Sequence, residues 1–209
     1  MNIAILGTSG QAKETADLIK ENINGKIVGF VDKNFSSGKI FDYKLLGTDQ
    51  QINSIIKRYK VTHFFVAIGD IKTRSKIYLT MKKILKPLTI VSKKANISKY
   101  ARFGEHVIIY PGVTINAEVV VGDNVYINSN AAIAHEVKIG NHVNVNPGVN
   151  IAGKVIIDDY CFIGIGASIR ENLRIAKNTI IGGGAMVTKD TKPGKTYIGV
   201  PAKIMTTRE

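Results

Sequence analysis

The chain has 209 residues, of which 44% are hydrophobic, an ordinary share for a globular protein that excludes wholesale disorder. Its net charge of +13 is uneven, because residues 1–96 hold 17 Lys and Arg against 7 Asp and Glu. The basic residues have helical spacing rather than the aromatic-interleaved clusters of a nucleic-acid surface, so no nucleic-acid partner is expected. A single cysteine, no signal peptide and no bilayer-length apolar run predict a cytoplasmic protein without a membrane partner.

The first half of the chain alternates predicted strands and helices. Strands are expected at NIAILG, KIVGFVDK and THFFVAIGD, and helices within TSGQAKETADLIKEN and IKTRSKIYLTMKKIL. Strands that alternate with helices favour a small parallel sheet of the α/β class. The basic segment IVSKKANIS follows, and we place a domain boundary there, which gives domains of residues 1–92 and 93–209.

Polar and glycine residues follow three of these strands. The turn at residues 7–10 could hold phosphate with backbone N–H groups at a helix N-terminus, and Asp32 ends a strand where an acidic residue often contacts ribose. Ligands of such sheets lie beyond the strand carboxyl ends, so residues 7–11, Asp32 and Gly69 should cluster. An ordinary turn with a strand-end Asp explains the same residues, and the incomplete glycine motif disfavours a nicotinamide enzyme.

The second half contains a six-residue repeat. From Ile97 to Val187 an aliphatic or aromatic residue recurs at every sixth position, and a small or apolar residue follows most of them four positions later. One inward aliphatic in each repeat cannot bury its surface alone, but stacked coils bury it jointly. The pattern therefore predicts a hexapeptide β-helix with three repeats in each triangular coil and with Gly and Asn at its corners.

The segment IAHEVKIGNHVNV holds two of the four histidines. Three repeats per coil place His135 between Ala117 and Gly153 of the neighbouring coils, so it should project beside a notch, as suits a general base. Glu136 could orient the imidazole ring and stabilise its protonated form. Alternatively, Glu136 could pair with Lys154 in the next coil.

A metal site is a rival interpretation of the histidines. His106 and His142 share a column but lie two coils apart, or about 9.6 Å. Zinc needs its nitrogen ligands within about 2.1 Å of the metal, so no site within one chain is expected. Only a site shared between subunits would remain.

The motifs together resemble the bacterial sugar acetyltransferases of the PglD/NeuD type. The resemblance covers the whole chain and rests on GTSGQAKETADLI, FVD, FVAIGD, the hexapeptide run with HEVKIG, IGGGAMV and the terminal IGVPAK. It implies a Rossmann-like α/β domain that binds a nucleotide sugar, followed by a left-handed parallel β-helix. It also implies a homotrimer with acetyl-CoA bound between adjacent helices, and no metal.

The resemblance also implies roles for individual residues. His135 resembles the general base, Glu136 the residue that raises its basicity, and Asn128 a polar active-site residue. The implied substrate-binding residues are Ser9, Gly10, Gln11, Asp32, Lys33 and Gly69, and those implied for acetyl-CoA are Asn144, Gly153, Ile165 and Gly183. Two positions depart from the family pattern, since Gln11 and Asn144 replace family histidines, and His142 is offset by two residues from the second.

The resulting hypothesis is acetyl transfer from acetyl-CoA to the amino group of a nucleotide-linked amino sugar, in particular a UDP-4-amino-6-deoxy sugar of bacterial surface glycans. His135 would accept the proton and a backbone N–H, that of Gly153, would stabilise the oxyanion. One alternative is O-acetylation of sialic acid. Another, from a different class, is a non-catalytic β-solenoid assembly module.

Overall fold

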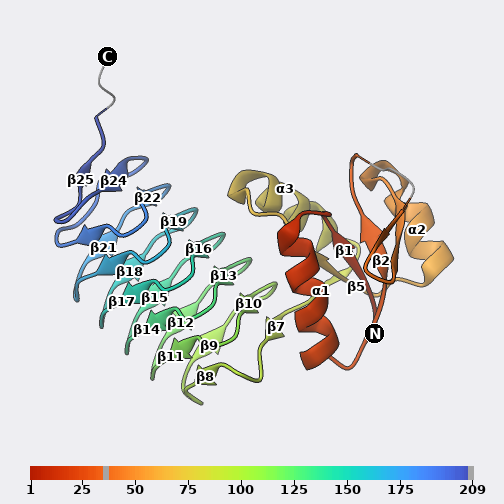
Figure 1. Ribbon diagram of the computed structural model, residues 1–209, viewed down its shortest axis with the longest axis horizontal. Coiled ribbons are helices and arrows are strands. Elements are labelled where there is room, and N and C mark those ends of the chain that lie inside the picture. The colour runs from red at the N-terminus through yellow and green to blue at the C-terminus, as the bar shows by residue number, and fades with distance from the viewer. Residues whose placement is uncertain (35–37, 207–209) are drawn as a thin grey trace. The chain divides into compact units, whose positions relative to one another are not determined.

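The computed structural model describes residues 1–34 and 38–206, and it divides into two compact units, Met1–Ile90 and the chain from Val91 onward. The division lies two residues before the expected boundary. Helices occur in the first unit, and the second consists of stacked short strands (Figure 1). Both parts of the expected fold class, an α/β unit followed by a left-handed parallel β-helix, are confirmed.

The first unit is built on a six-stranded sheet in the order β3-β4-β2-β1-β5-β6. All neighbouring strands are parallel except β3 and β4. Because β2 and β5 flank β1 on opposite sides, the chain reverses its direction of winding beside β1, and such a switch point opens a crevice at the strand carboxyl ends. The elements are β1 (Asn2–Leu6), α1 (Gly10–Asn22), β2 (Lys26–Val31), β3 (Lys39–Ile40), β4 (Tyr43–Gly47), η1 (Asp49–Gln51), α2 (Ile52–Tyr59), β5 (His63–Val66), α3 (Ile71–Met81) and β6 (Lys86–Pro87).

Helices α2 and α3 cover one face of this sheet. Ile55 of α2 and Tyr78 of α3 join a buried cluster with Ala4, Leu6 and Phe64 of the strands. Successive strand residues point to opposite faces, so this cluster uses alternate residues of β1. No helix within residues 1–34 and 38–206 is long and apolar enough to cross a bilayer.

The second unit has three parallel sheets, one for each side of a triangular coil. The first holds β7 (Ile90–Val91), β10 (Ile108–Ile109), β13 (Tyr126–Ile127), β16 (Asn144–Val145), β19 (Phe162–Ile163), β22 (Ile180–Ile181), β24 (Thr196–Ile198) and the antiparallel β25 (Lys203–Ile204). The second holds β8 (Asn96–Ile97), β11 (Thr114–Ile115), β14 (Ala132–Ile133), β17 (Asn150–Ile151), β20 (Ser168–Ile169) and β23 (Met186–Val187). The third holds β9 (Arg102–Phe103), β12 (Val120–Val121), β15 (Lys138–Ile139), β18 (Ile156–Ile157) and β21 (Arg174–Ile175).

Consecutive coils are offset by three repeats, as the sequence pattern predicts. Ile115 pairs with Ile133, which pairs in turn with Ile151 and Ile169. These aliphatic residues and the small residues four positions after them form one continuous buried core. At each corner, every sixth residue from His106 to Gly184 has a positive φ between 55° and 74°.

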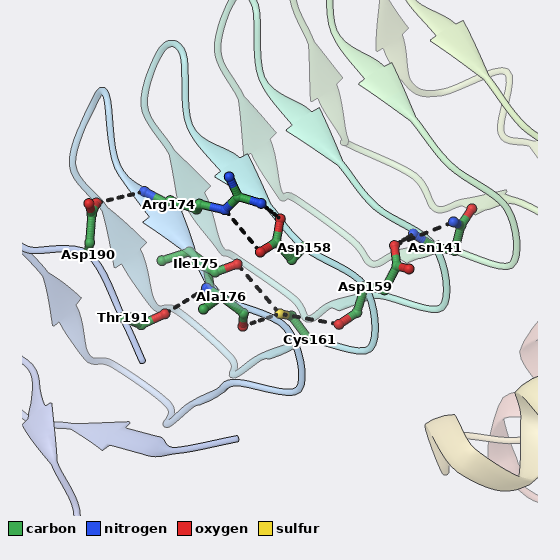
Figure 2. A network of polar contacts seen from close by, with 9 residues as sticks. All are labelled: Asn141, Asp158, Asp159, Cys161, Arg174, Ile175, Ala176, Asp190 and Thr191. Carbon is green, nitrogen blue, oxygen red and sulfur yellow. Dashed lines mark hydrogen bonds and ion pairs between the residues drawn. The ribbon is translucent and has the colours of Figure 1, made fainter. Parts of the chain in front are cut away.

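Side chains at one row of corners tie consecutive coils together (Figure 2). The carboxylate of Asp159 accepts the backbone N–H of Asn141 at 2.8 Å, and the amide oxygen of Asn141 accepts the N–H of Asp123 at 2.8 Å. Gly122 leaves room for this ladder, since a β-carbon there would lie 2.7 Å from Oδ1 of Asn141. Nearby, Arg174 donates two hydrogen bonds of 3.0 Å to Asp158.

Cys161 lies in the core beside these corners. Its side chain is fully buried, and Sγ donates to the carbonyl of Ala176 at 3.2 Å (Figure 2). Burial raises the pKa of the thiol to about 12, because a thiolate would lose its hydration there. The cysteine is therefore a neutral core residue.

Candidate functional site

A crevice opens at the carboxyl ends of β1, β2 and β5. Its volume is about 430 Å³, and four of the six residues expected to bind the nucleotide sugar line it, namely Ser9, Asp32, Lys33 and Gly69. The three strand ends are thus brought together as the parallel sheet requires. Gly10 and Gln11 are not among the lining residues and lie in the first turn of α1.

Gly7 makes the tight turn after β1 possible. Its φ is +111°, and a β-carbon there would lie 2.7 Å from the carbonyl oxygen of Ala67, which follows β5. Only glycine fits a position that combines this φ with so close an approach. At Gly10, by contrast, an added β-carbon would meet nothing within 4 Å.

Both oxygens of the Asp32 carboxylate are fixed. Oδ2 accepts the hydroxyl of Thr8 at 2.7 Å, and Oδ1 accepts the backbone N–H of Asn34 at 2.9 Å. Thr8 and Asn34 line the crevice together with Asp49 and Thr73. The sequence interpretation included Thr8 in the turn at residues 7–10 but named none of the other three. The sequence could have indicated Asn34, because an Asp commonly accepts the backbone N–H of the residue two positions later, and Asp32 stands two positions before Asn34.

The second group of candidate residues surrounds His135 at a corner of the β-helix. Nδ1 of His135 lies 3.0 Å from Oε1 of Glu136, so the carboxylate can accept a hydrogen bond from Nδ1 and orient the ring. The His135 side chain is 59% exposed, as access to a substrate requires. Glu136 has a φ of 61°, which turns the chain at this corner.

Gly153 forms the notch expected beside His135. A β-carbon there would lie 2.7 Å from both Cε1 and Nε2 of the imidazole, so the ring covers the glycine. Among the described residues, no acceptor pairs with the backbone N–H of Gly153. In this it differs from the equivalent N–H of Asp123, which Asn141 caps.

Lys154 also reaches Glu136, as the structural alternative supposed. Its Nζ lies 3.9 Å from the same Oε1 that faces His135, and both side chains are about half exposed. An exposed ion pair at this distance contributes about 0–1 kcal/mol. The shorter contact with His135 therefore dominates the position of Glu136.

The remaining candidates lie elsewhere on the coil. Asn128, Ile165 and Gly183 belong to the preceding corner, between the first and second sheets, where a β-carbon on Gly183 would lie 3.1 Å from Cγ2 of Ile165. The amide of Asn128 donates to the carbonyl of Val145 at 3.2 Å. Asn144 is a buried strand residue that pairs with Tyr126 and Phe162. One chain thus divides the candidates between two corners and one strand.

His142 is a corner residue of the β-helix. It has a φ of 58° and is buried, and its Nδ1 lies 2.8 Å from Nδ2 of Asn124. Oδ1 of Asn124 in turn lies 2.9 Å from Nδ1 of His106, so the column is a ladder of hydrogen bonds. Within residues 1–34 and 38–206, no three or more His, Cys, Asp and Glu side chains form a group suited to a metal.

Comparison with known proteins identifies both units. Residues 2–81 match the PglD N-terminal domain, and residues 118–153 match six repeats of the bacterial transferase hexapeptide. The chain combines a PglD-type N-terminal domain with the hexapeptide repeats of bacterial transferases. Both the resemblance and the acyltransferase class inferred from the sequence are thereby confirmed.

Solved structures of similar proteins match this PglD-type chain over almost its whole length. PerB from Caulobacter crescentus, in complex with CoA and GDP-perosamine, is 28% identical, with 99% of this chain and 98% of PerB covered and a TM-score of 0.93. WeeI from Acinetobacter baumannii is also 28% identical, with 98% and 100% covered and a TM-score of 0.86. The acetyltransferase domain of PglB from Neisseria gonorrhoeae, in complex with acetyl coenzyme A, shares the fold at 24% identity, with 98% of each chain covered and a TM-score of 0.89.

Proposed function

We propose that the chain transfers an acetyl group from acetyl-CoA to the amino group of a nucleotide-linked amino sugar. The observation that carries this proposal is the corner at His135, where a carboxylate-oriented imidazole covers a glycine whose N–H is uncapped. A base and an N–H donor side by side suit attack of an amine on a thioester. PerB, crystallised with CoA and GDP-perosamine, supports the same chemistry.

Each residue at the corner of His135 has a different role in the proposed reaction. As the sugar nitrogen bonds to the thioester carbon, Nε2 of His135 accepts the proton that the nitrogen releases. The N–H of Gly153 stabilises the negative charge on the thioester oxygen. The carbon–sulfur bond then breaks, and the proton on His135 passes to the departing thiolate. The carboxylate of Glu136 stabilises the imidazolium while His135 holds this proton.

Acetyl-CoA is proposed to lie between two copies of the chain in a homotrimer. Asn128, Ile165 and Gly183 lie on a different corner from His135, so a ligand that contacts both sets of residues could bridge two chains. A neighbouring copy that presents its corner of Ile165 and Gly183 to His135 would complete the site. Ile165 is 64% exposed, which suits an apolar contact with a ligand or a partner.

The first unit is proposed to hold the nucleotide, with Ser9, Asp32, Lys33 and Gly69 in contact with it and Gly10 and Gln11 beside it. A UDP-4-amino-6-deoxy sugar of surface glycans remains the predicted substrate, and a GDP-linked sugar is its competitor because PerB was crystallised with GDP-perosamine. We place the reaction in the cytoplasm.

The test is release of the CoA thiol with a panel of UDP-, GDP- and dTDP-linked amino sugars and free sialic acid. We expect release with one of the nucleotide sugars, and a loss of about 10²- to 10⁴-fold in kcat for His135→Asn. The matched control is His63→Asn, in β5 of the first unit, which should keep the wild-type rate. Release with sialic acid alone would favour O-acetylation, and failure to bind CoA would favour an assembly module.

A further inference from the structure

A second cavity lies in the first unit beside the crevice. Its volume is about 350 Å³, and Thr8 and Asn34 line both spaces, so the two adjoin. The rest of its lining comes from α1, β3, β4 and the turn between the two strands: Lys13, Lys39, Ile40, Phe41 and Leu45.

The two spaces differ in charge. The crevice contains the carboxylates of Asp32 and Asp49 together with the ammonium group of Lys33, whereas the described lining of the second cavity contains two lysines and no carboxylate. Lys13 and Lys39 are exposed and have no carboxylate partner among the described residues. The Asp32 carboxylate accepts hydrogen bonds from Thr8 and Asn34 and forms no ion pair with either lysine among the described residues.

We propose that the second cavity holds the diphosphate of the nucleotide, bound by Lys13 and Lys39, while the crevice holds the nucleoside. This inference rests on the proposed function. Phosphate oxygens are repelled by carboxylates and bind lysine ammonium groups, whereas ribose hydroxyls and base N–H groups donate to carboxylates.

The proposed phosphate site differs from the site that the glycine turn at residues 7–10 would predict. The glycine turn alone would put the phosphates against the backbone N–H groups at the start of α1, where no lysine is required. In the proposed site, the side chains of Lys13 and Lys39 recognise the negative charge of the diphosphate. Their removal should therefore weaken a diphosphate selectively and leave a nucleoside unaffected.

The experiment is calorimetric titration of UDP, GDP, their monophosphates and their nucleosides into the full chain and its variants. Lys13→Met and Lys39→Met should each lower the affinity for the preferred diphosphate about tenfold or more and leave that for its nucleoside within about twofold. Lys13→Arg should stay within a few-fold of wild type. Lys20→Met, in the last turn of the same helix, is the matched control and should bind as wild type does.

Unchanged diphosphate affinity in both Met variants would overturn the inference and return the phosphates to the glycine turn. An equal loss for nucleoside and diphosphate would overturn it as well. A wild-type chain that binds no nucleoside diphosphate would overturn the nucleotide assignment as a whole. If the selective loss is found but no substrate yields acetyl transfer, the binding inference stands and the proposed reaction fails.

Discussion

The imidazole of His135 lies against the α-carbon of Gly153 in the next coil, so closely that a β-carbon on Gly153 would come within 2.7 Å of Nε2. The register of three repeats per coil produces this relationship, because it stacks residue 153 on residue 135. No side chain can therefore be added at position 153 unless the proposed base moves.

The change Gly153→Ala should lower kcat by about 10- to 100-fold, because displacement of a base by about 1 Å is costly to the rate. The measurement is steady-state thiol release at saturating substrates. A double-mutant cycle on stability provides the control. Gly153→Ala should cost less free energy of unfolding in a His135→Ala background than in wild type, because the ring is absent there. Equal costs in both backgrounds would contradict a clash with the ring.

The roles of Glu136 and Lys154 can be distinguished by the effect of their substitution on kcat. Glu136→Gln should lower kcat by about tenfold or more, since the neutral amide no longer stabilises the imidazolium. Lys154→Met removes only an exposed contact of 3.9 Å and should change kcat less than about fivefold. If Lys154→Met were as damaging as Glu136→Gln, the ion pair between the coils would be the main role of Glu136.

The two glycines of the turn after β1 should differ in their effect on stability. Gly7→Ala should lower the free energy of unfolding by about 1–3 kcal/mol, because of its positive φ and the contact with Ala67. Gly10→Ala meets open space and should stay within about 0.5 kcal/mol of wild type. Urea denaturation of both variants measures the contrast, and equal effects would refute the role given to Gly7.

The buried thiol gives a prediction about alkaline pH. Because burial raises the pKa of Cys161 to about 12, the folded state holds its proton more tightly than the unfolded state does. The stability that Cys161 contributes is thus fully present below the ordinary thiol pKa and is lost as the pH rises toward 12. Between about pH 9 and pH 11, the free energy of unfolding of wild type should fall relative to that of Cys161→Ala by about 1.4 kcal/mol per pH unit.

Urea titrations of both proteins at pH 8, 9.5 and 10.5 would measure this difference, with the other titrating groups common to the pair. In the same pH range, a thiol reagent should label Cys161 only after denaturation. A difference in stability that stays constant across the three pH values would show that the thiol is not shielded.

The β-helix could be predicted almost residue by residue, because each coil must turn one aliphatic such as Ile133 inward at a fixed interval. The notch at Gly153 followed from the same register. The crevice was partly predictable, since parallel strands must end together and Asp32 ends one of them. In these cases a local pattern and the fold constrain the same positions.

Other features depended on contacts that no local pattern encodes. The hydroxyl of Thr8 reaches Asp32 only because β1 and β2 are neighbours in the sheet. Lys39 comes from a two-residue strand, too short to be recognised by alternation. The family resemblance assigned roles to Asn128 and His135 without indicating that one chain places them on different corners.

The register also limits how the length of the β-helix can change. Deletion of one residue within a coil would move Asn146 into the place of Val145 and Gly164 into that of Ile163, and would continue so through every later coil. Addition or loss of a whole coil keeps each aliphatic inside. Related chains should therefore differ in this domain by whole coils, each of which moves the terminal strands about 4.8 Å from the corner of His135.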